Sequence, residues 1–185
     1  MRAGASAEAE WTWEPPTEGT VEIRGNAVWN GTRRSAAATR PVSMMFQEAR
    51  LFPWFTVVEN VALPLMVSGR DTELQDLSDL MGWVGLQDQM EALPPELSGG
   101  ERQRAALARA VIMSPEVILA DEPTGNVDWE MSLRLLRLLI ELNRMGKTVM
   151  IATHDMNLIR QAKAQVQARV LRISDRRLQL AGADL

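Results

Sequence analysis

The stretch from Leu97 to Asp128 constrains what this chain of 185 residues can fold into more than any other part of it. It reads LSGGERQRAALARAVIMSPEVILADEPTGNVD. A serine and two glycines precede a helix-forming run, a Ser-Pro pair breaks that run, and a short apolar segment follows that ends in two adjacent carboxylates. The pattern predicts a helix, a turn and a buried parallel strand that opens onto a site at its C-terminal end.

The start of the expected helix predicts a seat for a phosphate group. Ser98, Gly99 and Gly100 stand where a helix offers unpaired N–H groups and the positive end of its dipole to an anion. Ser98 and Glu101 also form an S-x-x-E capping box, which any helix could use. A cap does not need two glycines, each of which costs about 1 kcal/mol in a helix relative to alanine. We therefore expect a ligand to approach this backbone closely.

The end of the apolar segment predicts the second part of the site. After Val117–Ala120 come Asp121 and Glu122, of which one can serve the magnesium of a nucleotide while the other orients or deprotonates a water. Taken alone, such a pair is more often an ordinary strand that ends in a solvated acidic turn. The order of the motifs favours the site, because Gly125–Asp128 and a second apolar strand leading to His154 follow without interruption.

Together these motifs resemble those of the nucleotide-binding subunit of ABC-type ATPases, over about residues 15–185. The resemblance implies an α/β core of the P-loop NTPase type, with a helical subdomain inserted over about residues 50–110. Residues 120–155 most resemble the FtsE-type branch of the family, which serves cell division. Residues 46–65 look as much like the ATPases of nitrate or sulfonate importers. We expect an ATP-hydrolysing subunit of a membrane complex, FtsE-like or, as the alternative, from an importer or a lipoprotein-type transporter.

The resemblance also implies a role for each candidate site residue, with ATP and Mg²⁺ as the cofactors. The residues that activate the attacking water or sense the γ-phosphate would be Glu122, His154 and Gln47. The magnesium ligands would be Asp121 and Gln47. The nucleotide-binding residues would come from two motifs. The signature motif, which binds the γ-phosphate held by the opposing subunit, would be Ser98, Gly99, Gly100 and Glu101, and the D-loop aspartate would be Asp128.

The partners implied by the resemblance are a second nucleotide-binding subunit and a membrane protein. The two nucleotide-binding subunits would pair head to tail, and the integral membrane partner would be an FtsX-like or permease subunit that contacts the helical subdomain. The chain has no apolar run of the roughly 20 residues needed to span a bilayer. We therefore expect a cytoplasmic protein, peripheral at the inner face of the membrane. Its net charge of −4 gives no indication of nucleic-acid binding.

One motif of the family has no counterpart in these 185 residues. The phosphate loop, G-x-x-x-x-G-K-[ST], should lie before Pro15, and residues 1–14 match nothing in the family. The only Gly-Lys-Thr is Gly146–Thr148, but Glu141 stands where that motif needs its first glycine, so we expect Gly146 to end a helix. With its N-terminal strands and phosphate loop missing, the chain is expected to be inactive on its own. Three readings remain open: an ATPase truncated or altered at its front, a non-catalytic partner that supplies only a signature half-site, and a remnant without function.

Apolar periodicity gives the remaining expected elements. Strands are expected at 21–25, 42–46, 117–120 and 148–152, helices at 60–67, 72–84, 101–113, 129–144 and 157–166, and a terminal hairpin at 169–174 and 178–180. Residues 33–40 read as a polar connection. We also expect the missing phosphate-loop strand to leave Val117–Ala120 as an exposed apolar edge unless residues 1–14 cover it.

Overall fold

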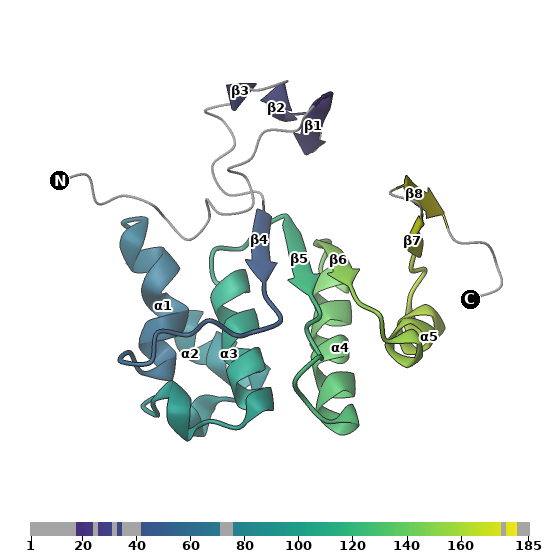
Figure 1. Ribbon diagram of the computed structural model, residues 1–185. Helices are drawn as coiled ribbons and strands as arrows, with labels where there is room; N and C mark the ends of the chain where they lie inside the picture. The colour runs from purple at the N-terminus through teal and green to yellow at the C-terminus, as the bar shows by residue number, and fades with distance from the viewer. Residues whose placement is uncertain are drawn as a thin grey trace.

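The computed structural model describes residues 18–23, 26–30, 33–34, 42–70, 76–174 and 177–180. In these residues helices and strands are arranged around a small parallel sheet (Figure 1). The strands are β1 Thr20–Ile23, β2 Asn26–Asn30, β3 Arg33–Arg34, β4 Val42–Met45, β5 Val117–Asp121, β6 Thr148–Ala152, β7 Leu171–Ser174 and β8 Arg177–Leu180. The α-helices are α1 Val57–Val67, α2 Leu77–Val84, α3 Gly99–Val111, α4 Trp129–Arg144 and α5 Met156–Gln165, and two short 3₁₀ helices are η3 Gln87–Gln89 and η4 Pro94–Glu96.

The central sheet has the strand order β4-β5-β6, with all three strands parallel. Val117 lies opposite Val42 on one side and Thr148 on the other. The buried residues Ile118 and Ala120 point to the same face of β5, as expected from the period of two in a strand. Strand β5 therefore lies inside the sheet.

The expected apolar edge at Val117–Ala120 is wrong, because β5 is paired on both sides. Within the described residues the two outer strands are β4 and β6, and β6 has no fully buried residue. Met44, Leu119 and Met150 lie in one row across the three strands, and 56% of Met150 is exposed. The apolar surface of the sheet thus becomes accessible at β6 and not at β5, because the partner strands of β5 come from segments on both sides of it in the sequence.

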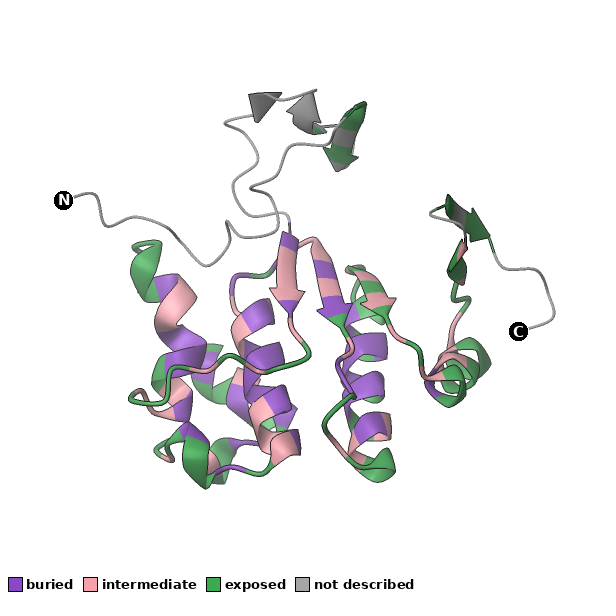
Figure 2. Cartoon of the chain, viewed as in Figure 1, coloured by how far each residue is buried: buried purple, intermediate pink, exposed green. Residues whose placement is uncertain are grey.

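Helices α3 and α4 cover one face of this sheet (Figures 1 and 2). Leu107 of α3 and Leu135, Leu139 and Leu142 of α4 pack in one cluster with Ile118 of β5. The expected helix 129–144 is confirmed at both ends, and its leucines recur at the spacing that gives a helix an apolar stripe. A second stripe of α4, with Leu136 and Ile140, packs against Leu158 of α5.

Helices α1, α2 and α3 form a second cluster beside the sheet (Figure 1). Their fully buried side chains include Val57, Val61, Leu65, Met81, Val84 and Ala108. The turn before α1 is fixed by Asn60, whose buried side chain bonds the backbone of Phe52, Phe55 and Thr56. The expected helix 72–84 begins later, at Leu77, and residues 71–75 lie outside the described part.

The remaining strands form two small antiparallel sheets. β1, β2 and β3 make one, and β7 with β8 makes the expected terminal hairpin. Arg33 and Arg34 are a short strand and not a polar connection, while residues 35–40 lie outside the described part. Gly146 ends α4 with φ +88°, which confirms the expected helix end. None of the helices in the described residues is long and apolar enough to cross a membrane.

The exposed row at β6 makes a prediction about self-association. An open strand edge with apolar side chains promotes aggregation, so Met150→Lys should slow aggregation several-fold at high protein concentration. The matched control is Met145→Lys, which adds the same charge at a position that is 70% exposed at the C-cap of α4, outside the strands of the sheet. Light scattering against time measures the effect. Equal effects of the two variants would show that added charge alone is responsible.

Candidate nucleotide site

The parallel register brings the C-terminal ends of β4, β5 and β6 to one level. Met45 lies opposite Ala120, which lies opposite Ile151, and Asp121 lies opposite Ala152. The residues that follow each strand therefore all lie at the edge of the sheet formed by the C-terminal strand ends. Among them are Gln47, Glu122 and His154. This is the edge at which open α/β sheets bind ligands.

Glu122 is the most constrained of these residues. Its backbone has φ +41°, a left-handed conformation that is rare outside glycine. Its N–H donates to the carbonyl of Ala152 at 2.8 Å, and its carbonyl accepts from Gly125 N at 3.0 Å. Its carboxylate accepts three hydrogen bonds: Oε1 from His154 N at 2.9 Å and from His154 Nδ1 at 2.6 Å, and Oε2 from Thr153 Oγ1 at 3.0 Å. The surrounding contacts therefore determine both the strained backbone and the direction of the carboxylate.

The hydrogen bonds set the charge state of this pair. Burial by itself would raise the pKa of Glu122, but the hydrogen bonds from His154 and Thr153 outweigh it and the pKa is lowered. The pKa of His154 is raised by its hydrogen bond and its attraction to Glu122. The side chain of His154 is 86% exposed while that of Glu122 is 20% exposed, so solvent reaches the far nitrogen of the imidazole ring.

Gln47 is tied to two other parts of the site through its backbone. Its carbonyl accepts from Gln103 Nε2 of α3 and from Asn126 Nδ2 at 3.3 Å. Its side chain lies against Gly125, where an added Cβ would come within 3.0 Å of Gln47 Nε2. The segment after β4, the segment after β5 and helix α3 thus meet at one peptide.

Arg109 fixes the next residues of the same segment. Its guanidinium donates to the carbonyl of Ala49 at 2.7 Å and to that of Arg50 at 2.8 Å. Burial lowers the pKa of Arg109. Arg50 itself has φ +44°, so the hydrogen bonds from Arg109 hold a turn with a strained backbone. Movement of α3 would therefore be transmitted to residues 47–50.

The start of α3 has the expected capping box. Ser98 is the N-cap and accepts from Glu101 N at 3.3 Å, while Glu101 Oε2 accepts from Ser98 N at 2.8 Å and from Ser98 Oγ at 2.7 Å. These bonds from Ser98 lower the pKa of Glu101. Ser98 is exposed, so its hydroxyl lies at the surface of the molecule.

The two glycines of this helix start have a reason within the fold. A Cβ on Gly99 would come within 2.9 Å of the carbonyl oxygen of Asn126, and one on Gly100 within 2.5 Å of Met131 Cγ. The backbone of α3 is therefore close to the segment after β5 and to α4. Close packing within the chain thus gives both glycines a structural reason, and the expected close approach of a ligand stays a prediction.

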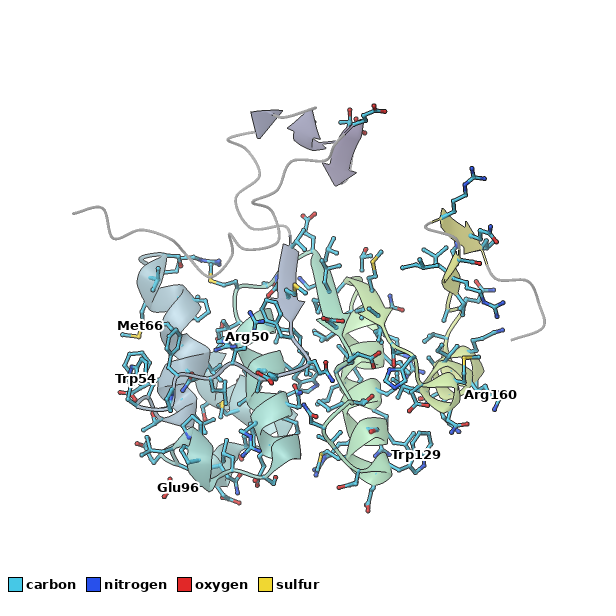
Figure 3. All side chains as sticks on the ribbon, in the orientation of Figure 1. Arg50, Trp54, Met66, Glu96, Trp129 and Arg160 are labelled. Atoms are coloured by element: carbon cyan, nitrogen blue, oxygen red, sulfur yellow. The ribbon has the colours of Figure 1, made fainter. Side chains whose placement is uncertain are left out.

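Asp128 is the N-cap of α4. Its Oδ1 accepts from Met131 N at 2.9 Å. Asp128 and the exposed Trp129 lie at the N-terminal end of α4 (Figure 3). This end follows the segment after β5, which contacts Gln47 and Gly99. The role expected of Asp128 in nucleotide binding stays a prediction, and the capping bond gives this residue a structural task as well.

The donor set suits a magnesium ion that a nucleotide brings with it. Asp121 is exposed at the end of β5, and Gln47 is exposed after β4. No group of three or more His, Cys, Asp or Glu in the described part could hold a metal by itself. Mg²⁺ is commonly held by one or two protein oxygens, with waters and phosphate oxygens as the other ligands. One carboxylate and one amide oxygen fit that pattern.

The chain belongs to the ABC transporter family. The family's sequence profile, described as ABC transporter, matches residues 11–125. The fold is accordingly that of an ABC ATPase domain, an α/β fold of the P-loop NTPase type. Within the family the chain is FtsE-like, and lipoprotein-releasing relatives are also similar to it.

Three curated relatives illustrate this likeness. The chain is 50% identical to the cell division ATP-binding protein FtsE of Haemophilus influenzae over 125 residues, which is 66% of this chain and 57% of that protein. It is 41% identical to FtsE of Escherichia coli K12, over 88% of this chain and 72% of that protein. It is 42% identical to the lipoprotein-releasing system ATP-binding protein LolD of Syntrophus aciditrophicus, over 80% of this chain and 68% of that protein.

A solved structure agrees with this assignment. A dimeric ATP-binding cassette in a post-hydrolysis state, bound to ADP and phosphate, superimposes with a TM-score of 0.65 at 31% sequence identity. The alignment covers 80% of this chain and 68% of the cassette. The chain thus spans between 57% and 72% of the length of these relatives.

Four side chains that act at this site were not found from the sequence. Gln103, Arg109 and Asn126 hold the segment after β4, and Thr153 holds Glu122. Each bonds to a group that is distant in the sequence, and no periodicity or motif marks such a contact. Thr153 alone had a usable signal, since it directly precedes His154.

The contact between His154 and Glu122 predicts a pH dependence. With the pKa of His154 raised above 6.5 and that of Glu122 lowered below 4.5, the contact stabilises the fold fully between these ordinary values. This stabilisation is lost as the pH rises through the raised pKa of His154 or falls through the lowered pKa of Glu122. Because His154 is the only histidine, a proton NMR titration should give a midpoint above 6.5. Glu122→Gln should return the midpoint to about 6.5, and a normal midpoint in the unchanged chain would contradict the contact.

The close packing of α3 predicts the effect of adding one methyl group. Gly100→Ala should lower the free energy of unfolding by about 1–3 kcal/mol, because its Cβ would overlap Met131. Gly82→Ala is the control: this glycine lies within α2, and a Cβ there would meet Gln87 at an ordinary 3.4 Å. The control should be neutral or stabilising by up to about 1 kcal/mol. Chemical denaturation of both variants measures the difference, which should be absent if the helix start is loosely packed.

Proposed function

We propose that this chain is an ATP-binding subunit of an ABC-type membrane complex, and that its own Glu122 takes part in ATP hydrolysis. The observation that carries the proposal is the convergence of Gln47, Glu122 and His154 at one edge of the sheet, with Glu122 held as a carboxylate by His154. An ionised carboxylate close to a nucleotide can orient and deprotonate a water.

His154 would serve a γ-phosphate while it stays in contact with Glu122. An ionised carboxylate only accepts hydrogen bonds, so Nδ1 of His154 carries a proton in this contact. The raised pKa favours the imidazolium form, in which Nε2 carries a proton as well. The ring is exposed, so this second N–H can donate to a phosphate oxygen. One histidine can thus connect the phosphate to the carboxylate.

Asp121 and Gln47 would hold the magnesium of ATP. When bound, Mg²⁺ neutralises charge on the phosphate oxygens. The signature residues Ser98, Gly99 and Gly100, with Glu101 as the partner of Ser98, would present N–H groups and the Ser98 hydroxyl to the nucleotide of a second subunit. In this arrangement two subunits pair head to tail, and Asp128 would take part in nucleotide binding.

The membrane partner, FtsX-like or a permease subunit, would bind the helical part of the domain, about residues 50–110 of a domain that spans 15–185. An aromatic turn supports this assignment: the rings of Phe52, Trp54 and Phe55 contact one another, with ring centroids 5.7 to 6.4 Å apart. Trp54 is 68% exposed and Met66 of α1 is 56% exposed, and both lie on the outer side of this cluster (Figure 3). Exposed aromatic and apolar side chains are typical of protein interfaces. Through this partner the chain would sit at the cytoplasmic face of the membrane.

A second function is supported by the start of α3, which is capped by Ser98 and lies at the surface. The chain would then supply only its signature to the nucleotide of an intact relative, and its own Asp121 and Glu122 would be idle. The capped and exposed helix start is fully formed in this chain, which is all that such a half-site needs.

Mixed dimers of this chain with an intact FtsE-type relative distinguish the two functions. In this chain, Ser98→Arg should abolish the ATPase activity of the composite site under either function, because its side chain would block the phosphate. Glu122→Gln should cost a large part of the activity if the chain also hydrolyses ATP at its own site, and almost none if it supplies only a half-site. The ATPase rate of each purified mixed dimer is the measurement. Full activity in the Ser98→Arg dimer would contradict both functions.

A further inference from the structure

The side chain of Thr153 connects the segment that follows β5 to the end of β6. It follows β6 directly and precedes His154, and its side chain is partly buried. Its hydroxyl oxygen lies 3.0 Å from Glu122 Oε2 and 3.1 Å from the N–H of Asp155. Two polar groups from different segments therefore meet at one hydroxyl.

The direction of the hydroxyl proton is fixed by these two neighbours. The N–H of Asp155 can only donate, so it occupies an acceptor position on Thr153 Oγ1. The ionised carboxylate of Glu122 can only accept, so the hydroxyl proton points at Oε2. The branch at Cβ restricts the rotamer of threonine, which keeps the hydroxyl in place.

The backbone on both sides of Thr153 is also held. Asp155 caps α5, since its Oδ1 accepts from Asn157 N at 2.8 Å and from Leu158 N at 3.2 Å. On the other side, Ala152 accepts from Glu122 N at 2.8 Å. Thr153 thus lies between a capped helix and a strand of the sheet, and its hydroxyl has little conformational freedom.

We infer that Thr153 is a positioning residue, whose hydroxyl orients the carboxylate of Glu122 so that Oε1 faces Nδ1 of His154. With Oε2 turned toward the Thr153 hydroxyl, Oε1 faces His154, where it makes the 2.6 Å contact with the ring and the 2.9 Å contact with the N–H. The same contact fixes the neutral ring of His154 in the tautomer with hydrogen on Nδ1. This inference rests on the proposed role of Glu122 in hydrolysis, but its test does not require turnover.

The tautomer of His154 reports the orientation directly. In the full chain labelled with ¹⁵N-histidine, long-range proton–nitrogen correlation spectra give the protonation state of each ring nitrogen. His154 is the only histidine, so its signals need no separation from others. Spectra are recorded well above the midpoint of its titration, where the ring is neutral. The unchanged chain should show mainly hydrogen on Nδ1.

Thr153→Val keeps the shape of the side chain and removes the donor. The ratio of the Nδ1–H to the Nε2–H tautomer should fall by about tenfold, as expected when a hydrogen bond to a charged group is lost. Thr153→Ser, which keeps the hydroxyl, should retain a ratio close to that of the unchanged chain. Thr148→Val is the matched control, because Thr148 is exposed at the start of β6, the strand that Thr153 follows, and its backbone is paired to Val117.

The outcomes separate positioning from a merely structural role. A structural threonine would change the melting temperature and leave the tautomer ratio as it was. The inference is overturned if a folded Thr153→Val chain keeps the original ratio, or if Thr153→Ser loses it to the same extent. Amide spectra check the fold, and Thr153→Ala replaces the valine variant if that variant unfolds. A chain that never hydrolyses ATP but shows the expected tautomer change would contradict the proposed function alone.

Discussion

The parallel pairing of β4, β5 and β6 in a single register is the constraint on which the rest of the structure depends. Each strand ends at the same level, so the segments that follow them meet in space although they are far apart in the sequence. Parallel strands need long connections, and here these connections are the helices that cover one face of the sheet. A slip of one residue would turn Ile118 and Ala120 away from α3 and α4 and would also carry Glu122 away from Thr153.

Helix α3 is the second organising element, because it contacts the segments that follow β4 and β5. Its first turn carries the signature and packs on the segment after β5, its middle carries Gln103, and its end carries Arg109. The last two bond to backbone carbonyls of residues 47–50. A nucleotide that shifts the start of α3 would therefore displace the segment that contains Gln47, which in turn leads into the aromatic turn. Hydrogen bonds to main-chain atoms thus connect α3 with the segment that leads to the aromatic turn.

Local strain is concentrated where the chain leaves the sheet. Among the described non-glycine residues, Arg50, Ser114 and Glu122 have left-handed backbones, and Glu122 and Arg50 lie in segments that follow strands of the central sheet. Each is held by donors from another segment: Glu122 by Thr153 and His154, and Arg50 by Arg109. Such conformations cost about 1–3 kcal/mol each and persist because the surroundings over-determine them. Strain at Glu122 therefore agrees with a site that is organised before any ligand arrives.

The sequence by itself determined the family, the order of the elements and the type of most of them. Helix 129–144 and strand 148–152 could be placed because apolar periodicity is a local property of the chain, and the cap at Ser98 because a capping box lies within four residues. Only the tertiary structure decided that β5 is an inner strand, since pairing depends on segments that periodicity does not relate. It also decided why Gly99 and Gly100 are glycines, because an added Cβ meets atoms that come from distant parts of the chain.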